Sequence, residues 1–118
     1  MILAVRIQVT IPGDPAIPLN NVRLSLYDRD ENDPDDFLAE GITNEHGEIL
    51  LSFDPDRYTD REDQEKWRTE SLPDLFVIVF GPDGQVIHST RAQAQIDKLP
   101  RVIQVVLSRE LARANGLI

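Results

Sequence analysis

Cysteine is absent from the 118 residues of this sequence, so neither disulfide bonds nor a zinc ion bound by thiolates can hold the fold together. Long hydrophobic runs are absent too, since the longest, residues 75–80, is far shorter than the roughly 20 apolar residues of a membrane-spanning helix. Residues 1–11 lack the continuous apolar segment of a signal peptide, because Arg6 and Gln8 interrupt it. We therefore expect no membrane insertion and, by default, a cytoplasmic location.

Basic residues are scarce: 12 Lys and Arg stand against 21 Asp and Glu, which gives a formal net charge of -9. The resulting field repels phosphate backbones and anionic surfaces, so nucleic acid is not an expected partner. The expected partner is instead another protein, or a second copy of this chain. The length suits a single domain over residues 1–118 with one apolar core.

Apolar and polar residues alternate along several short segments, which is the pattern of half-buried β-strands. The strands are predicted over residues 3–11, 22–27, 37–43, 48–53, 75–80, 85–89 and 102–107. Residues 12–21 contain three prolines and are predicted to form a loop. The turn Asn44-Glu45-His46-Gly47 predicts that the two strands flanking it are antiparallel neighbours.

Two short helices interrupt this pattern. The capping box at residues 59–62 predicts a helix over about residues 60–68, held to the protein by Tyr58 and Trp67. Ser108 is expected to cap a last helix over residues 109–114. The prediction is an all-β fold: a seven-stranded antiparallel Greek-key sandwich with a short helical insertion and a short C-terminal helix.

Two motifs joined by an aspartate-rich loop carry a family resemblance. Residues 24–28 read Leu-Ser-Leu-Tyr-Asp, and residues 38–47 read Leu-Ala-Glu-Gly-Ile-Thr-Asn-Glu-His-Gly. Both resemble the transthyretin-like and carboxypeptidase-regulatory-like sandwich domains. Residues 73–90, PDLFVIVFGPDGQVIHST, are similar to the buried strand-turn-strand of such modules in large bacterial multidomain proteins. The resemblance covers about residues 22–107 and implies a transthyretin-like, prealbumin-type sandwich.

Enzymes built on related sandwiches need residues that this sequence does not supply. Hydroxyisourate hydrolases of the transthyretin family have an early histidine and a C-terminal Tyr-Arg-Gly-Ser, whereas this chain has Leu-Ala-Val-Arg at residues 3–6 and Ala-Asn-Gly-Leu-Ile at residues 114–118. Intradiol dioxygenases bind iron through two tyrosines and a His-x-His pair, but His46 and His88 are far apart in the sequence. We therefore predict no enzyme activity, no catalytic residue and no organic cofactor.

Five aspartates lie within nine residues of the predicted loop 28–36. They are Asp28, Asp30, Asp33, Asp35 and Asp36. Ca²⁺ takes six to eight oxygen ligands, so this loop is a candidate calcium site. It is not an EF-hand, because Asp33 and Ala39 occupy the loop positions that require Gly and Glu.

The order of the predicted strands places loops 28–36, 54–73 and 90–101 at the same end of the sandwich. This end is expected to be an acidic pole that carries its own basic counter-charges. Such a surface is more often solvated and laced with salt bridges than occupied by a metal. Both interpretations remain open at this stage.

Residues 75–80 are apolar on both faces of the predicted strand. Leu75, Val77 and Val79 lie on one face, and Phe76, Ile78 and Phe80 lie on the other. One face packs in the sandwich. Phe76, Ile78 and Phe80 are a candidate partner surface, which either the helix with Trp67 or another chain covers. We therefore expect a non-enzymatic protein-interaction or structural module that acts in a larger assembly or multidomain protein. The alternative is a calcium-stabilised adhesion or carbohydrate-surface module that uses loop 28–36.

Overall fold

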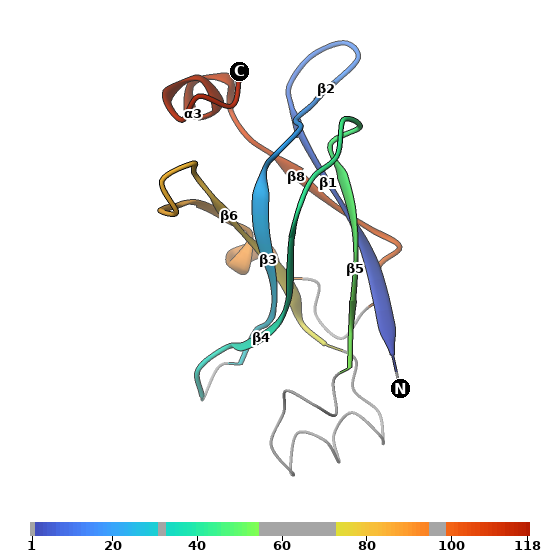
Figure 1. The fold of residues 1–118 in the computed structure, drawn as a ribbon. Coiled ribbons are helices and arrows are strands. Elements are labelled where there is room, and N and C mark those ends of the chain that lie inside the picture. Colours follow the sequence, from blue (N-terminus) through green and yellow to red (C-terminus); the bar gives the residue numbers. More distant parts are fainter. Residues whose placement is uncertain (1, 31–32, 55–72, 95–98) are drawn as a thin grey trace.

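The computed structural model describes residues 2–30, 33–54, 73–94 and 99–118. In this part of the chain two four-stranded β-sheets pack against each other (Figure 1). The first sheet contains β1 (Leu3–Ile11), β2 (Ile17–Pro18), β5 (Glu48–Phe53) and β8 (Val102–Val106). The second sheet contains β3 (Arg23–Asp28), β4 (Asp36–Ile42), β6 (Leu75–Phe80) and β7 (Val86–Ser89). The predicted all-β sandwich is therefore confirmed.

Strand β2 lies inside residues 12–21, which the sequence predicts as a loop. It pairs Ile17 with Ile11 and Pro18 with Thr10. Proline is tolerated here because β2 pairs along only one edge, so the missing N–H removes no further ladder bond. The predicted loop is therefore wrong for Ile17 and Pro18. A two-residue strand is too short to show the alternation by which a strand is predicted.

In the first sheet β1 is central. It pairs antiparallel with β5 over Leu3–Gln8 and parallel with β8 over Arg6–Thr10. β2 pairs with the same side of β1 as β5 does, farther along the strand. Between the two, Val9 N donates to Gly47 O, just before β5, and Val9 O accepts from Leu19 N, just after β2. The predicted purely antiparallel sandwich is thus wrong for the β1–β8 pair. Parallel neighbours need a long crossover, and here the whole chain between β1 and β8 provides it.

In the second sheet the order is β4-β3-β6-β7, and every pair is antiparallel. The predicted pairing of the strands on either side of the Asn44–Gly47 turn is wrong, because β4 and β5 belong to different sheets. The two ends of the turn are bonded to different layers: Thr43 N donates to Val22 O, just before β3, while Gly47 O accepts from Val9 N in β1. The turn therefore closes one side of the sandwich.

The core lies between the two sheets and consists of alternating residues, as the sequence pattern predicts. In β6 the inward set is Leu75, Val77 and Val79, each at most 1% exposed. The other strands contribute Val5, Ile7, Val9 and Ile11 from β1, Leu24 and Leu26 from β3, and Ile103 and Val105 from β8. Burial of these side chains, at about 25 cal/mol per Å² of apolar surface, is what holds the layers together.

Helix α3 (Arg109–Ala114) follows β8 as predicted, and its Ser108 cap is confirmed: Ser108 Oγ accepts from Leu111 N at 3.0 Å. A single 3₁₀ turn, η1 (Arg91–Gln93), follows β7. The predicted helix at residues 60–68, with Tyr58 and Trp67, lies outside the described residues. Within the described ranges no helix is long and apolar enough to span a membrane.

Candidate functional site

The side of the sandwich opposite the Asn44–Gly47 turn is bordered by β8 in one sheet and β7 in the other. Between them lies a groove of about 410 Å³, a size within the range of ligand sites. Its lining comes from β6, β7, η1 and β8 and from Thr90. The residues are Leu75, His88, Thr90, Gln93, Val102, Ile103, Gln104 and Val106.

The hydrogen bonds between β1 and β8 decide which backbone groups of β8 face this groove. Arg6 N donates to Arg101 O at 3.2 Å, and Leu107 N donates to Thr10 O at 2.9 Å. In a parallel ladder alternate residues bond to the neighbouring strand, so the odd-numbered residues of β8 bond to β1. The N–H and C=O groups of Val102, Gln104 and Val106 therefore point away from β1. We call these groups the β8 edge.

In the described part of the chain no strand pairs with the β8 edge. The first sheet runs from β5 and β2 through β1 to β8, so β8 is its edge strand among the described residues. An extended segment placed beside β8 would lie in the groove and extend the sheet.

The other edge strands carry features that discourage further pairing, and β8 does not. β4 contains Asp36 and Glu40, and its register with β3 is irregular. β5 begins with Glu48, and β7 has only four residues with an irregular register. Charges, bulges and short length are the usual means by which proteins protect sheet edges. β8, with the sequence Val-Ile-Gln-Val-Val, has no charge, proline or register shift.

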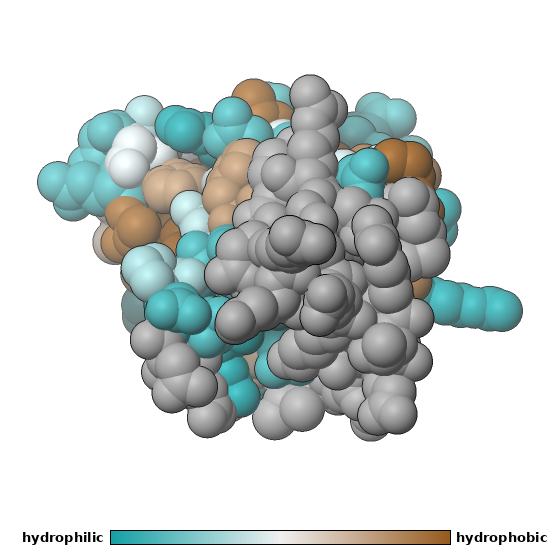
Figure 2. All heavy atoms as spheres, turned by 90° about the horizontal axis from the view of Figure 1, so that it is seen from below, coloured by the Kyte–Doolittle hydropathy of each residue, from teal (hydrophilic) through white to brown (hydrophobic). Residues whose placement is uncertain are grey.

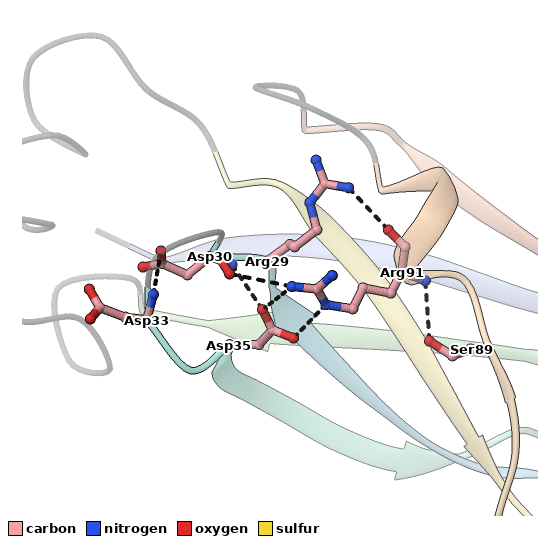
Figure 3. A network of polar contacts seen from close by, with 6 residues as sticks. All are labelled: Arg29, Asp30, Asp33, Asp35, Ser89 and Arg91. Carbon is pink, nitrogen blue, oxygen red and sulfur yellow. Dashed lines mark hydrogen bonds and ion pairs between the residues drawn. The ribbon is translucent and has the colours of Figure 1, made fainter.

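Seen toward the end of the molecule that carries loop 28–36, the described surface shows hydrophilic residues interspersed with hydrophobic ones (Figure 2). The Asp35 carboxylate is bound by Arg91 through two hydrogen bonds, 2.8 Å from Nε to Oδ2 and 3.1 Å from Nη2 to Oδ1 (Figure 3). Arg91 Nη2 also donates to Asp30 O at 3.3 Å. Arg29 donates from Nη1 to Arg91 O at 3.3 Å, so two arginines join loop 28–36 to η1.

Three carboxylates of the candidate calcium site, those of Asp35, Asp30 and Asp28, accept hydrogen bonds from backbone N–H groups. Asp35 Oδ1 accepts from Asp30 N, Asp30 Oδ1 accepts from Asp33 N, and Asp28 Oδ1 accepts from Asp74 N. Asp36 begins β4, with Asp28 as its Cα partner across the strands. The structure thus brings Asp30, Asp33 and Asp35 together and directs Asp28 to another segment. Of the three loops predicted to gather at one end, 28–36 and 90–101 meet through Arg91, and residues 55–72 of the third lie outside the described residues.

The pKa of Asp35 lies below its usual value, mainly because of the hydrogen bonds from Arg91. Partial burial raises it, while the Asp30 N–H and the charges of Arg91 and Arg29 lower it. A carboxyl with a lowered pKa in the folded state stabilises the fold above its unfolded pKa of about 3.9, and this contribution disappears as the pH falls through the folded value.

We expect Arg91→Ala to lower the free energy of unfolding at pH 7 by up to about 1 kcal/mol, because both partners are partly exposed to solvent. The difference from the wild type should begin to shrink as the pH falls below about 3.9, where Asp35 of the unfolded chain takes up a proton, and should disappear below the lowered pKa of Asp35 in the folded protein. Urea unfolding at pH 7 and pH 3 measures this. Asp35→Asn is the control, since in its background Arg91→Ala should show no such pH dependence. An equal loss at both pH values in the wild-type background would contradict the assignment.

Groups of three or more potential metal ligands are absent from the described residues. Because Asp35 is already bound by Arg91, we expect millimolar Ca²⁺ to leave the melting temperature unchanged. A ligand that binds only the folded state must raise it. Differential scanning fluorimetry with Ca²⁺ and then EGTA is the measurement, and a rise that EGTA reverses would support the calcium site instead.

The candidate partner surface on the outer face of β6 is largely covered by its own sheet. Phe76 is only 1% exposed: it stacks on Tyr27 with ring centroids 5.5 Å apart, and the Arg91 guanidinium lies 5.9 Å from its ring centroid. Phe80 is half-buried beneath Arg23, whose guanidinium lies 4.9 Å from the ring centroid, and Ile78 is half-buried as well. Phe76 is therefore covered within the protein, Ile78 and Phe80 are covered in part, and the proposed Trp67 lid lies outside the described residues.

No protein-family model matches the sequence, and no curated protein does. Among solved structures, a 9R-lipoxygenase from Cyanothece PCC8801 is similar, with a TM-score of 0.52 and 21% sequence identity. The match covers 91% of this chain but only 16% of the lipoxygenase chain. At this identity the likeness concerns the fold alone. The two-sheet arrangement thus recurs as a small part of a much larger protein.

Proposed function

We propose that this chain is a non-enzymatic protein-interaction module that binds an extended segment of a protein partner along the β8 edge. Strand addition of this kind uses backbone hydrogen bonds for affinity and side-chain pockets for specificity. The observation that carries the proposal is the β8 edge, which no strand of the described residues pairs and which carries no charge, proline or register shift. The groove between β8 and β7 provides the room.

We further propose that the sandwich is of the transthyretin-like type and acts within a larger assembly or multidomain protein. The sequence motifs at residues 24–28 and 38–47 support the first point. The likeness to a segment that makes up 16% of a larger chain is consistent with the second. A fold alone does not determine function, so the proposal rests on the edge and its groove.

Selection from a displayed library of linear random peptides on the immobilised protein tests this function. We expect peptides of at least about five residues, the length of β8, that bind the wild type and fail to bind Gln104→Pro, in which one outward N–H is removed. Enrichment of nothing above background, or of peptides that bind both proteins equally, would contradict the proposal.

A further inference from the structure

We infer, on the basis of the proposed function, that the segment bound at the β8 edge carries uncharged, apolar side chains at the alternate positions that face the core. The inference comes from the chemistry of the groove walls. Leu75, Val102, Ile103 and Val106 are apolar, and the described lining contains no Asp, Glu, Lys or Arg. A charge buried against these residues would lose its hydration and would find none of those four side chains among them as a counter-charge.

The two faces of an added strand meet different surroundings. Residues paired with β8 share its faces, so those on the side of Ile103 and Val105 point into the sandwich, where both of these side chains are buried. Residues on the side of Val102 and Val106 point outward, where Val102 is 38% exposed and Val106 is 54% exposed. Charge is therefore excluded from the inward positions and tolerated at the outward ones.

The register sets the minimum length. The outward groups of Val102, Gln104 and Val106 offer three positions at which a neighbouring strand can exchange hydrogen bonds. A segment that uses all three spans five residues, or about 13 Å at roughly 3.3 Å per residue. Side-chain alternation over five residues places two or three side chains in the groove.

The sequence of β8 itself makes a suitable probe. In an antiparallel register with Gln104 opposite Gln104, Val102 pairs with Val106 on both sides, and all three pairs are hydrogen-bonded. Ile103 and Val105 of the peptide then face inward. A fluorescein-labelled peptide of residues 102–107, Val-Ile-Gln-Val-Val-Leu, is short enough to add as a single strand without bringing a second folded domain.

Fluorescence anisotropy with three peptides tests the inference. The second peptide carries Ile103→Asp and Val105→Asp, and the third carries Val102→Asp and Val106→Asp, so both have the same added charge on opposite faces. We expect the second to bind the protein at least about tenfold more weakly than the parent, and the third to bind within about threefold of it. Equal affinities for the second and third peptides would overturn the inference.

Two further results separate this inference from the proposed function. If displayed peptides bind at the β8 edge but prefer acidic or basic inward residues, the inference of uncharged inward side chains is wrong and strand addition stands. If no peptide binds in either experiment, both fail. A dimer in light scattering that Gln104→Pro converts to a monomer would assign the edge to a second copy of the chain and would overturn the inference.

Discussion

Replacing Gln104 with proline is expected to reduce the affinity for an extended peptide at least about tenfold, equivalent to about 1.4 kcal/mol. Proline removes the central N–H of the β8 edge and places its ring where the added strand would lie. A backbone hydrogen bond contributes about 0.5–1.5 kcal/mol net, and the ring also hinders the bonds on either side. Isothermal titration calorimetry with a selected peptide measures the loss.

The same substitution should leave the fold intact, because residue 104 lies on the side of β8 that does not bond to β1. Gln104→Thr is the matched control: it changes the side chain but keeps the N–H and suits a strand. We expect Gln104→Thr to bind the peptide within about threefold of the wild type. Equal losses of affinity for the two variants would show that the Gln104 side chain binds the peptide, which would contradict strand addition. An unchanged affinity for Gln104→Pro would contradict it too.

Replacing Gly47 with alanine is expected to cost about 3 kcal/mol of stability. Gly47 has φ +70°, and a Cβ there would lie 2.6 Å from Val9 O and 3.0 Å from Leu19 N. The left-handed conformation costs an alanine about 1–2 kcal/mol, and forcing β1 and β2 apart adds about 1–3 kcal/mol. Denaturant unfolding followed by circular dichroism measures the difference.

Gly84 is the matched control for this substitution. Its φ of +85° is similar, but a Cβ there would meet nothing within 4 Å. Gly84→Ala should therefore cost only the conformational term, about 1–2 kcal/mol. The difference between the two variants isolates the close packing of the turn that closes the sandwich opposite the β8 edge. Equal costs would show that the turn is not packed against β1 and β2 as described.

Local sequence patterns predict the strands and the last helix well, because alternation and capping depend on neighbouring residues. The inward residues of β1 and β6 follow directly from period-two alternation. The arrangement of strands in sheets depends on distant contacts. The turn at Asn44–Gly47 has hairpin chemistry, yet Thr43 bonds to Val22 and Gly47 bonds to Val9 in the other layer. Nothing in the turn itself specifies these partners.

For the sites, the sequence indicates which residues gather but not what they bind. The aspartates of loop 28–36 are visible as a cluster, and basic counter-charges at that end are expected. That Arg91 in particular binds Asp35 could not be predicted, because 56 residues separate them. The β8 edge was missed because an unpaired edge is a property of the sheet order. Its signal in the sequence is the absence of charge in residues 102–106.

Amide hydrogen exchange by NMR measures directly whether the β8 edge is unpaired. We expect that in the free protein the amides of Val102, Gln104 and Val106 exchange rapidly, whereas those of Ile103 and Val105 are protected by β1. Adding a selected peptide should slow exchange at the three outward amides at least about tenfold. Protection of these amides in the free protein, or unchanged exchange in the presence of bound peptide, would contradict the account.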